Sequence, residues 1–273
     1  MPVNITAIQT FLSVVRTRNL NRAADEMNIT QSAVTARLDA LEAQLHAKLL
    51  IRSRKGAELT KAGFAFLDQA ELIARTWENA RARLSLPEGV TRLCSLVIEP
   101  GLWAGLAAPW VAELRATHGE TAFEIWSGLA TNAARWLQSG LSDAALLSEP
   151  LTGPDISTRL FSTEPLIQVA TRPRPVMTWD PDYVFVDYGR AFRSQHAAAW
   201  PGDDTAGLSF STPDWALSHL LEHGGSAYLP LGLAAPHITE KHLFRIDGAT
   251  RFERRTYLSW RKSGKDTFPW LTP

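Results

Sequence analysis

The sequence predicts an α/β protein with a helix-rich N-terminal head, a long linking helix and a body of two α/β lobes. Apolar residues recur at helical spacing through the first 45 residues, and a second seam of apolar residues runs from Phe66 to Leu84. From Leu93 onward, apolar strand-like runs alternate with amphipathic helical patterns, which is typical of α/β units. The 273 residues leave room for about two domains, and Pro87, Glu88 and Gly89 mark the predicted boundary between them.

Composition and charge restrict the class of protein. No apolar run approaches the roughly 18 residues of a membrane span, and the N-terminus lacks the features of a signal peptide, so we expect a cytoplasmic protein without a membrane partner. The single cysteine, Cys94, excludes an internal disulfide and a thiolate zinc site. Residues 1–61 hold nine Lys and Arg against five Asp and Glu, whereas residues 62–273 hold nineteen against twenty-three. A basic head on an acidic body indicates that the head binds a polyanion.

Three helices are predicted in the head, each preceded by a residue that can cap it. Asn4 precedes the first helix, Asn21 is expected to cap the second, and Thr30 precedes the third. The third helix has an apolar stripe made of Val34, Leu38, Leu41 and Leu45. The opposite side of its first turns carries short, mostly hydrogen-bonding side chains, namely Gln31, Ser32, Thr35 and Ala36.

The second and third helices, joined by the three-residue turn 28–30, predict a helix-turn-helix whose second helix enters the major groove N-terminus first. Gln31 can bond an adenine edge, Ser32 and Thr35 can serve several bases, and the Ala36 methyl can contact thymine. The alternative is a three-helix packing module with a solvated polar face.

The segment Lys48 to Leu59 predicts two short extended pieces around a basic turn, that is, a wing beside the third helix. Such a turn suits contacts along phosphates or an arginine in the minor groove. The residues expected to contact the DNA backbone or minor groove are Arg37, Arg52, Arg54 and Lys55.

The linking helix is predicted to begin at Lys61, capped by Thr60. Its apolar seam has alternating four- and three-residue spacing and consists of Phe66, Ala70, Ile73, Trp77, Ala80 and Leu84. This seam predicts a dimer. A seam of fewer than about four heptads is a weak coiled-coil signal, so the pattern alone is equally consistent with packing on the chain's own core. A dimer would set two recognition helices about 34–36 Å apart, so its target would be an imperfect inverted repeat in double-stranded DNA.

The chain resembles the LysR-type transcriptional regulators. The resemblance is carried by Phe11, Ala23-Ala24, Gln31 to Thr35, Leu41-Glu42, Leu49 to Arg52 and Leu59 to Gly63. It implies a winged helix-turn-helix in residues 1–60, a dimerisation helix in residues 61–87 and an effector-binding domain in residues 88–273. It also implies a homodimer or tetramer, a small-molecule effector and RNA polymerase as partners.

The sequence departs from the family pattern at two positions. His46 stands where the family usually has glycine, and Ala36 stands where arginine is common. Histidine tolerates a left-handed backbone better than most residues. The alanine removes a guanine or phosphate contact, so the family's base preferences do not transfer to this position.

The body is predicted to consist of two lobes that resemble the periplasmic-binding-protein-like effector domain of the same family. Lobe one spans about 91–162, with strands at 93–98, 121–127 and 143–147 and helices at 102–117 and 132–139. Lobe two spans about 163–240, with strands at 166–170, 183–187, 208–211 and 227–229 and helices at 190–200 and 214–223. A strand at 256–260 returns to lobe one.

Ligands in such sheets bind beyond the carboxyl ends of the strands, near helix N-termini. The effector-binding candidates at these positions are Glu99, Gly101, Leu102, Trp103, Ser127, Ser148, Asp187, Tyr188, Ser211, Thr212 and Leu229. Glu99 and Asp187 beside aromatic residues favour a neutral or cationic ligand held by cation–π contact. The alternative is that Glu99 pairs with Arg190 or Arg193 and that the tryptophans belong to the core.

The segment from His219 to His223 contains a motif found in enzymes. His219, Glu222 and His223 match the H-x-x-E-H signature of zinc proteases, which indicates a solute-binding or zinc-dependent hydrolase domain as the alternative function. The match ends at Gly224, and so short a motif is often coincidental. We therefore expect a regulator with no enzymatic activity, no cofactor and no bound metal.

Overall fold

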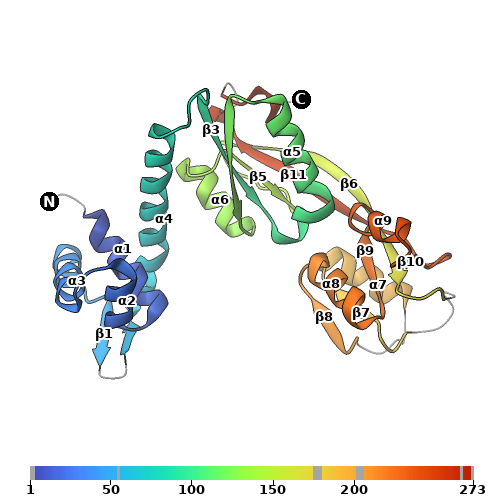
Figure 1. Ribbon diagram of the computed structural model, residues 1–273, viewed down its shortest axis with the longest axis horizontal. Coiled ribbons are helices and arrows are strands. Elements are labelled where there is room, and N and C mark those ends of the chain that lie inside the picture. The colour runs from blue at the N-terminus through green and yellow to red at the C-terminus, as the bar shows by residue number, and fades with distance from the viewer. Residues whose placement is uncertain (1–3, 54–55, 175–179, 201–205, 265–266, 272–273) are drawn as a thin grey trace. The chain divides into compact units, whose positions relative to one another are not determined.

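The computed structural model describes residues 4–53, 56–174, 180–200, 206–264 and 267–271. The chain divides into two compact units, an N-terminal unit up to Pro87 and a C-terminal unit from Glu88 onward (Figure 1). Among the described helices, none combines the length and the apolar character that crossing a membrane requires.

The N-terminal unit consists of four helices and a two-stranded wing. Its elements are α1 (Ile5–Thr17), α2 (Leu20–Met27), α3 (Gln31–Leu45), β1 (Leu50–Ser53), β2 (Gly56–Leu59) and α4 (Lys61–Leu84). Asn4, Thr30 and Thr60 cap α1, α3 and α4 through their side chains, as predicted. The prediction for α2 was wrong: Asn19 is its cap, because its side chain accepts from the backbone N–H groups of Asn21 and Arg22 at 2.9 and 3.1 Å.

The core of the N-terminal unit forms between the apolar faces of α1, α3 and α4 and the wing. Ile8, Phe11, Val34 and Leu38 are fully buried there. The backbone of α4 comes so close to the loop before β1 that a Cβ on Gly63 would lie 2.1 Å from the Leu49 carbonyl oxygen. Only glycine fits at this contact.

The C-terminal unit is built on a seven-stranded mixed sheet, in the order β10-β6-β11-β5-β3-β4 with β9 paired to β6. Its strands are β3 (Arg92–Ile98), β4 (Thr121–Ser127), β5 (Ala144–Leu147), β6 (Ile156–Ala170), β9 (Ser226–Pro230), β10 (Phe244–Arg245) and β11 (Phe252–Arg261). The helices are α5 (Ala108–Thr117), α6 (Ala130–Ser139), α7 (Arg190–Ala199), α8 (Pro213–His223) and α9 (Leu231–Thr239). A separate parallel pair consists of β7 (Val184–Val186) and β8 (Leu208–Phe210).

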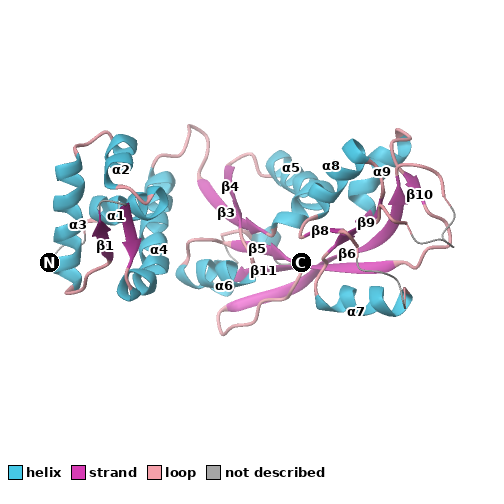
Figure 2. Cartoon of the chain, turned by 90° about the horizontal axis from the view of Figure 1, so that it is seen from below, coloured by secondary structure: helices cyan, strands magenta, loops and turns pink. Residues whose placement is uncertain are grey.

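Two lobes share this sheet and have separate hydrophobic cores. In lobe one, β3 pairs in parallel with β4 and β5, and its core includes Leu96, Leu146 and Leu258. In lobe two, the core includes Val169, Val186 and Leu229. The long antiparallel strands β6 and β11 run from one lobe to the other (Figure 2).

The structure corrects several predicted elements of the C-terminal unit. β6 and β11 extend well beyond the predicted strands 166–170 and 256–260, and α9 and β10 were not predicted. The predicted helix 102–117 is interrupted, because Ala104 and Gly105 have non-helical backbones and the regular helix begins at Ala108. Gly105 has a φ of 79°, and a Cβ there would lie 2.7 Å from the backbone nitrogen of Leu233 at the start of α9. This close approach between the lobes requires glycine and breaks the helix.

Candidate functional site

The first turns of α3 present a small polar surface. Gln31, Ser32 and Ala36 are exposed and Thr35 is half-buried, whereas Val34 and Leu38 on the other side of the helix are fully buried. Thr30 accepts from the Ala33 backbone N–H at 3.2 Å, and its hydroxyl lies 2.9 Å from that of Ser32. The structure therefore brings the four predicted base-contacting residues together at the exposed start of one capped helix.

The predicted phosphate contacts lie partly elsewhere. Arg37 is half-buried on α3, and Arg54 and Lys55 lie outside the described residues. Arg52, on β1 of the wing, forms ion pairs with Asp39 at 2.9 Å and Glu42 at 3.2 Å. In the free protein the Arg52 guanidinium is therefore engaged by two carboxylates of α3.

Glu42 is the buried centre of this contact, a role that no sequence pattern indicated. Its carboxylate accepts from the Lys48 ammonium at 2.8 Å and from the backbone N–H groups of Leu49 and Leu50 at 2.8 and 3.1 Å. Burial acts to raise the pKa of Glu42, but these hydrogen bonds and the charge of Arg52 outweigh it and hold the pKa below its usual value.

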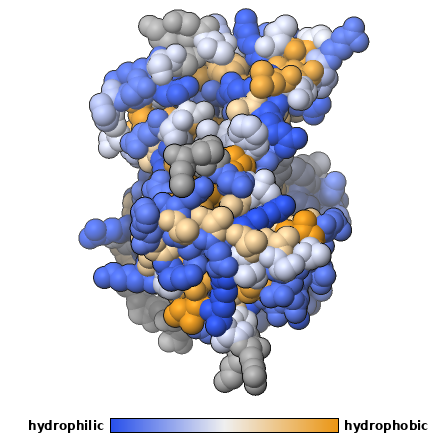
Figure 3. Space-filling model, turned by 90° about the vertical axis from the view of Figure 1, so that its left-hand side faces the viewer, coloured by the Kyte–Doolittle hydropathy of each residue, from blue (hydrophilic) through white to orange (hydrophobic). Residues whose placement is uncertain are grey.

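The apolar seam of α4 divides into two halves. Phe66, Ala70 and Ile73 pack against the core of the N-terminal unit, with the Phe66 ring centroid 5.6 Å from that of Phe11. The other half is exposed to solvent and consists of Trp77, Ala80 and Leu84. Trp77 is 47% exposed and Leu84 89% exposed, so only this half is available to a second chain. On the face shown in Figure 3, hydrophilic side chains predominate and hydrophobic ones form small separate groups.

A cleft of about 710 Å³ opens between the two lobes of the C-terminal unit. Its walls come from the segments that follow β3, β5, β7 and β8, as the strand-end rule predicts. Seven of the predicted effector-binding residues line it, namely Glu99, Gly101, Leu102, Ser148, Asp187, Tyr188 and Ser211. The other four predicted residues do not, namely Trp103, Ser127, Thr212 and Leu229.

The sequence reasoning missed the remaining lining residues. They are Glu149, Gly189, Arg190, Ala191, Ser194, Pro213 and Arg254. Most of them lie in the first turns of α7 and α8 or directly after β5. The same strand-end rule could have found them, whereas nothing in the sequence pattern indicated Arg254.

The two predicted cleft carboxylates have partners within their own lobes. Glu99 accepts from the backbone N–H and the hydroxyl of Ser148, each at 2.8 Å. Asp187 accepts from the Gly189 N–H at 2.9 Å and pairs with Arg193 at 2.5 Å. The alternative pairing of Glu99 with Arg190 or Arg193 is not found among the described residues: Ser148 donates to Glu99, and Arg193 pairs with Asp187.

Arg254 connects the lobes at the base of the cleft. This buried side chain donates to the Gly101 carbonyl of lobe one and to the Glu164 carboxylate on β6, both at 2.7 Å. Glu164 in turn accepts from the Gly232 N–H of α9 at 2.9 Å. The Arg254 guanidinium lies 5.9 Å from the centre of the Tyr188 ring, so it is the chain's own cation that faces this aromatic ring. Burial raises the pKa of Tyr188 far above its ordinary value, and its hydroxyl donates to the Tyr228 carbonyl at 2.9 Å.

The protease-like motif does not assemble a three-ligand metal site. The rings of His219 and His223 are 4.8 Å apart on α8, while Glu222 lies 3.7 Å from the Nε2 of His223. Within the described part of the chain, the group whose ligand atoms come together is His237, Glu240 and His242 instead.

A DNA-binding fold on one unit and a ligand-sized cleft on the other define the class of ligand-responsive DNA-binding regulators. Residues 5–64 match the family described as bacterial regulatory helix-turn-helix protein, lysR family, and residues 87–268 match the LysR substrate binding domain. The chain belongs to the LysR family of transcriptional regulators. It is thus a DNA-binding regulator with an effector-binding domain, in a family whose members bind DNA and small-molecule effectors and form oligomers.

Similar proteins of known sequence or structure agree with this assignment. The regulator HdfR of Escherichia coli is 26% identical over 264 residues, covering 95% of this chain and 93% of HdfR. The structure of CbnR is similar with a TM-score of 0.71 at 18% identity, covering 95% of this chain and 93% of CbnR. Vibrio fischeri DarR, solved in complex with DNA, has a TM-score of 0.56 at 20% identity and covers 99% of both chains. The two structural similarities establish the fold alone.

Proposed function

We propose that this regulator recognises its operator through Gln31, Ser32, Thr35 and Ala36 at the start of α3. The observation that carries the proposal is their exposure at a capped helix N-terminus whose other side is fully buried. Such a helix enters the major groove with these residues toward the base edges. Fluorescence anisotropy with DNA from upstream of its own gene tests this, because Gln31→Ala should reduce selectivity over scrambled DNA by relaxing the preference at one base pair.

Phosphate binding falls to Arg37 and the basic turn of the wing, including Arg54 and Lys55. Arg52 contributes in a different way, since Asp39 and Glu42 bind its guanidinium in the free protein. We infer that Arg52 fixes the wing against α3 and that the charges beyond it contact the DNA backbone.

The exposed half of the α4 seam is the proposed dimer contact. Trp77, Ala80 and Leu84 lie at seam spacing on one helix and are exposed in the single chain. A dimer through them would place two α3 helices on successive major-groove turns of an imperfect inverted repeat. Sedimentation of the Leu84→Lys variant tests this contact, with Lys61→Ala at the exposed start of α4 as the control. A dimer contact predicts that only Leu84→Lys weakens the dimer, whereas a solvent-exposed residue outside the interface predicts no effect of either variant.

The proposed effector site is the cleft between the lobes, and its charge favours a ligand with a cationic group. Three carboxylates line it, those of Glu99, Glu149 and Asp187. Two arginines also line it. Arg254 is paired with Glu164 and Asp187 is paired with Arg193. The two remaining carboxylates, Glu99 and Glu149, outnumber the one remaining arginine, Arg190. Thermal shift with size-matched amines and carboxylates tests the proposal. Amines should stabilise the protein, Glu99→Gln should lose the shift and exposed Glu113→Gln should keep it; stabilisation by carboxylates alone would exclude a cationic effector.

Regulation then follows from a shift between lobe arrangements. An effector that binds one arrangement better raises its population by its differential affinity and so changes how the dimer engages DNA and polymerase. We further infer that the protein acts in the cytoplasm, where its DNA is, and has no enzymatic activity. Zinc-dependent hydrolysis that is lost on His219→Ala would contradict the second inference.

A further inference from the structure

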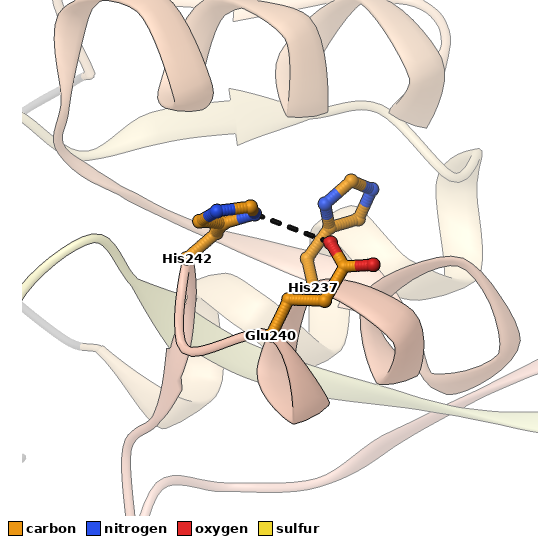
Figure 4. A group of neighbouring side chains, drawn as sticks. All are labelled: His237, Glu240 and His242. Carbon is orange, nitrogen blue, oxygen red and sulfur yellow. Dashed lines mark ion pairs between the residues drawn. The ribbon is translucent and has the colours of Figure 1, made fainter.

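The turn that follows α9 brings together two imidazoles and a carboxylate that neither DNA binding nor the effector cleft uses. His237 lies in the last turn of α9, Glu240 directly follows the helix, and His242 lies two residues further on. Figure 4 shows their side chains next to one another on the same side of this turn. The sequence reasoning overlooked the group, because it predicted no helix here.

The backbone fixes this arrangement. Lys241 adopts a left-handed conformation with a φ of 61°, which reverses the chain. The N–H groups of His242 and Leu243 then both donate to the His237 carbonyl, at 2.8 and 3.1 Å. This closure is typical of a helix C-terminus that turns back on itself. Leu233 within α9 and Leu243 after the turn are both buried in the core of lobe two, so the turn is anchored on either side.

The spacing of the ligand atoms suits a tetrahedral ion. One ligand atom from each residue lies within 4.8 Å of the other two. The His242 Nδ1 and the Glu240 Oε2 are 3.3 Å apart, and ligands bound to zinc at 2.0–2.1 Å are separated by about 3.3 to 3.4 Å in a tetrahedron. Side-chain rotation closes the remaining gap, because Glu240 and His242 are exposed and unconfined.

His237 has a ring nitrogen that is available to bind a ligand. It is half-buried, and its Nδ1 is buried without a hydrogen-bond partner within the described part of the chain. Leaving a buried polar atom without a partner is unfavourable. If Nδ1 binds a cation, the ion supplies the missing partner and removes this cost. If Nε2 binds the cation instead, the bond holds the imidazole ring in one orientation.

We propose that His237, Glu240 and His242 form a zinc-binding site at the end of α9. Two imidazoles and one carboxylate are a ligand set that Zn²⁺ takes in proteins, and three protein ligands leave one position for water or a further ligand. Harder cations such as Mg²⁺ and Ca²⁺ prefer oxygen ligands and are disfavoured here. An ion that joins the end of α9 to the turn after it stabilises lobe two by mass action.

Zinc titration of the tag-free, EDTA-treated full chain tests the site, with calorimetry for stoichiometry and thermal shift for stabilisation. We expect one zinc ion per chain and a rise in the melting temperature of the C-terminal unit. His242→Ala and Glu240→Gln should each weaken binding at least tenfold. Both residues are exposed, so the metal-free melting temperatures should match that of the wild type.

The matched control is the double variant His219→Ala/His223→Ala on α8. His223 and His242 border the same cavity of about 730 Å³, so the two histidine groups must be told apart. The double variant should still bind one zinc ion per chain with unchanged affinity. The proposal is overturned if the wild type binds no zinc, if His242→Ala binds as tightly as the wild type, or if only the double variant loses binding.

Discussion

The guanidinium of Arg52 on the wing donates to the buried carboxylate of Glu42 on α3 across 3.2 Å. The same carboxylate accepts from the backbone at Leu49 and Leu50, where the chain enters the wing. One buried acid therefore connects α3 to the wing. This acid therefore helps to set the position of the wing, where we propose phosphate contacts, relative to the start of α3, where we propose base contacts.

Removal of the Glu42 carboxylate should loosen the wing. Glu42→Ala leaves two buried N–H groups without an acceptor, each costing about 1–3 kcal/mol, so we expect a loss of about 2–6 kcal/mol. Hydrogen exchange of residues 47–52, followed by mass spectrometry, measures the loss directly. Asp39→Asn is the control, because it removes only an exposed partner of Arg52 and should cost less than about 1 kcal/mol. Equal protection in Glu42→Ala and the wild type would show that the carboxylate does not hold the wing.

The same network predicts acid sensitivity of the N-terminal unit. The pKa of Glu42 is lower in the folded state than its ordinary value of 4.5, so its contribution to stability is present above about pH 4.5 and is lost as pH falls through the folded-state pKa. The stability gap between the wild type and Glu42→Gln should therefore narrow on acidification below about pH 4.5. A gap of constant size from neutral pH to pH 3 would mean that the carboxylate is not preferentially ionised in the fold.

Loss of a base contact and loss of a phosphate contact should change DNA binding in different ways. Gln31→Ala should cost about 1–3 kcal/mol on the operator and relax preference at one base pair. Arg37→Ala should weaken binding to all sequences and reduce the salt slope by about one. Anisotropy across a salt series with operator and random DNA distinguishes the two. Similar losses on both DNAs for both variants would reject this division of roles.

The division of the α4 seam predicts two different consequences of mutation. Leu84→Lys should weaken dimerisation at least tenfold while leaving the fold intact, because Leu84 is exposed in the single chain. Ile73→Ala should destabilise the N-terminal unit by about 2–4 kcal/mol, because Ile73 packs against its core. Analytical ultracentrifugation and urea unfolding measure the two effects. A dimer that withstands Leu84→Lys and Trp77→Ala would place the interface elsewhere.

The buried pair of Arg254 and Glu164 should matter more than the exposed pair of Arg193 and Asp187. Removing one partner of a buried ion pair leaves the other charge buried without compensation. We therefore expect Arg254→Ala to lower the free energy of unfolding by about 3–5 kcal/mol. Arg193→Ala should cost less than about 1 kcal/mol, because the side chains of Arg193 and Asp187 are 52% and 39% exposed and solvent screens their attraction. Thermal denaturation of the full chain compares them. Equal melting temperatures for the two variants would show that Arg254 does not join the lobes.

The sequence was most informative where structure is determined locally. Thr30 and Thr60 cap their helices as predicted, since a cap needs only a side chain and the next turn. Seven of the predicted cleft residues line one cavity, because the carboxyl ends of neighbouring strands meet at one edge.

Contacts between distant segments could not be predicted in the same way. Arg254 lines the cleft because β11 pairs with β6 along most of its length. Both strands contain many polar residues, so a search for apolar runs predicted only short parts of them. The break at Gly105 depends on α9, more than 120 residues further along the chain. The seam of α4 keeps the same alternating spacing along its length, but the packing of the N-terminal core, which includes α1, decides which half is buried.

Sequence-selective DNA binding is tested by measuring the affinity of the purified chain for DNA from upstream of its own gene and for a scrambled fragment, using fluorescence anisotropy across a salt series. We expect selective binding with a steep salt dependence, and a change in that affinity when a stabilising amine occupies the cleft. Weak and equal binding to both fragments, unaffected by any ligand that stabilises the protein, would contradict it.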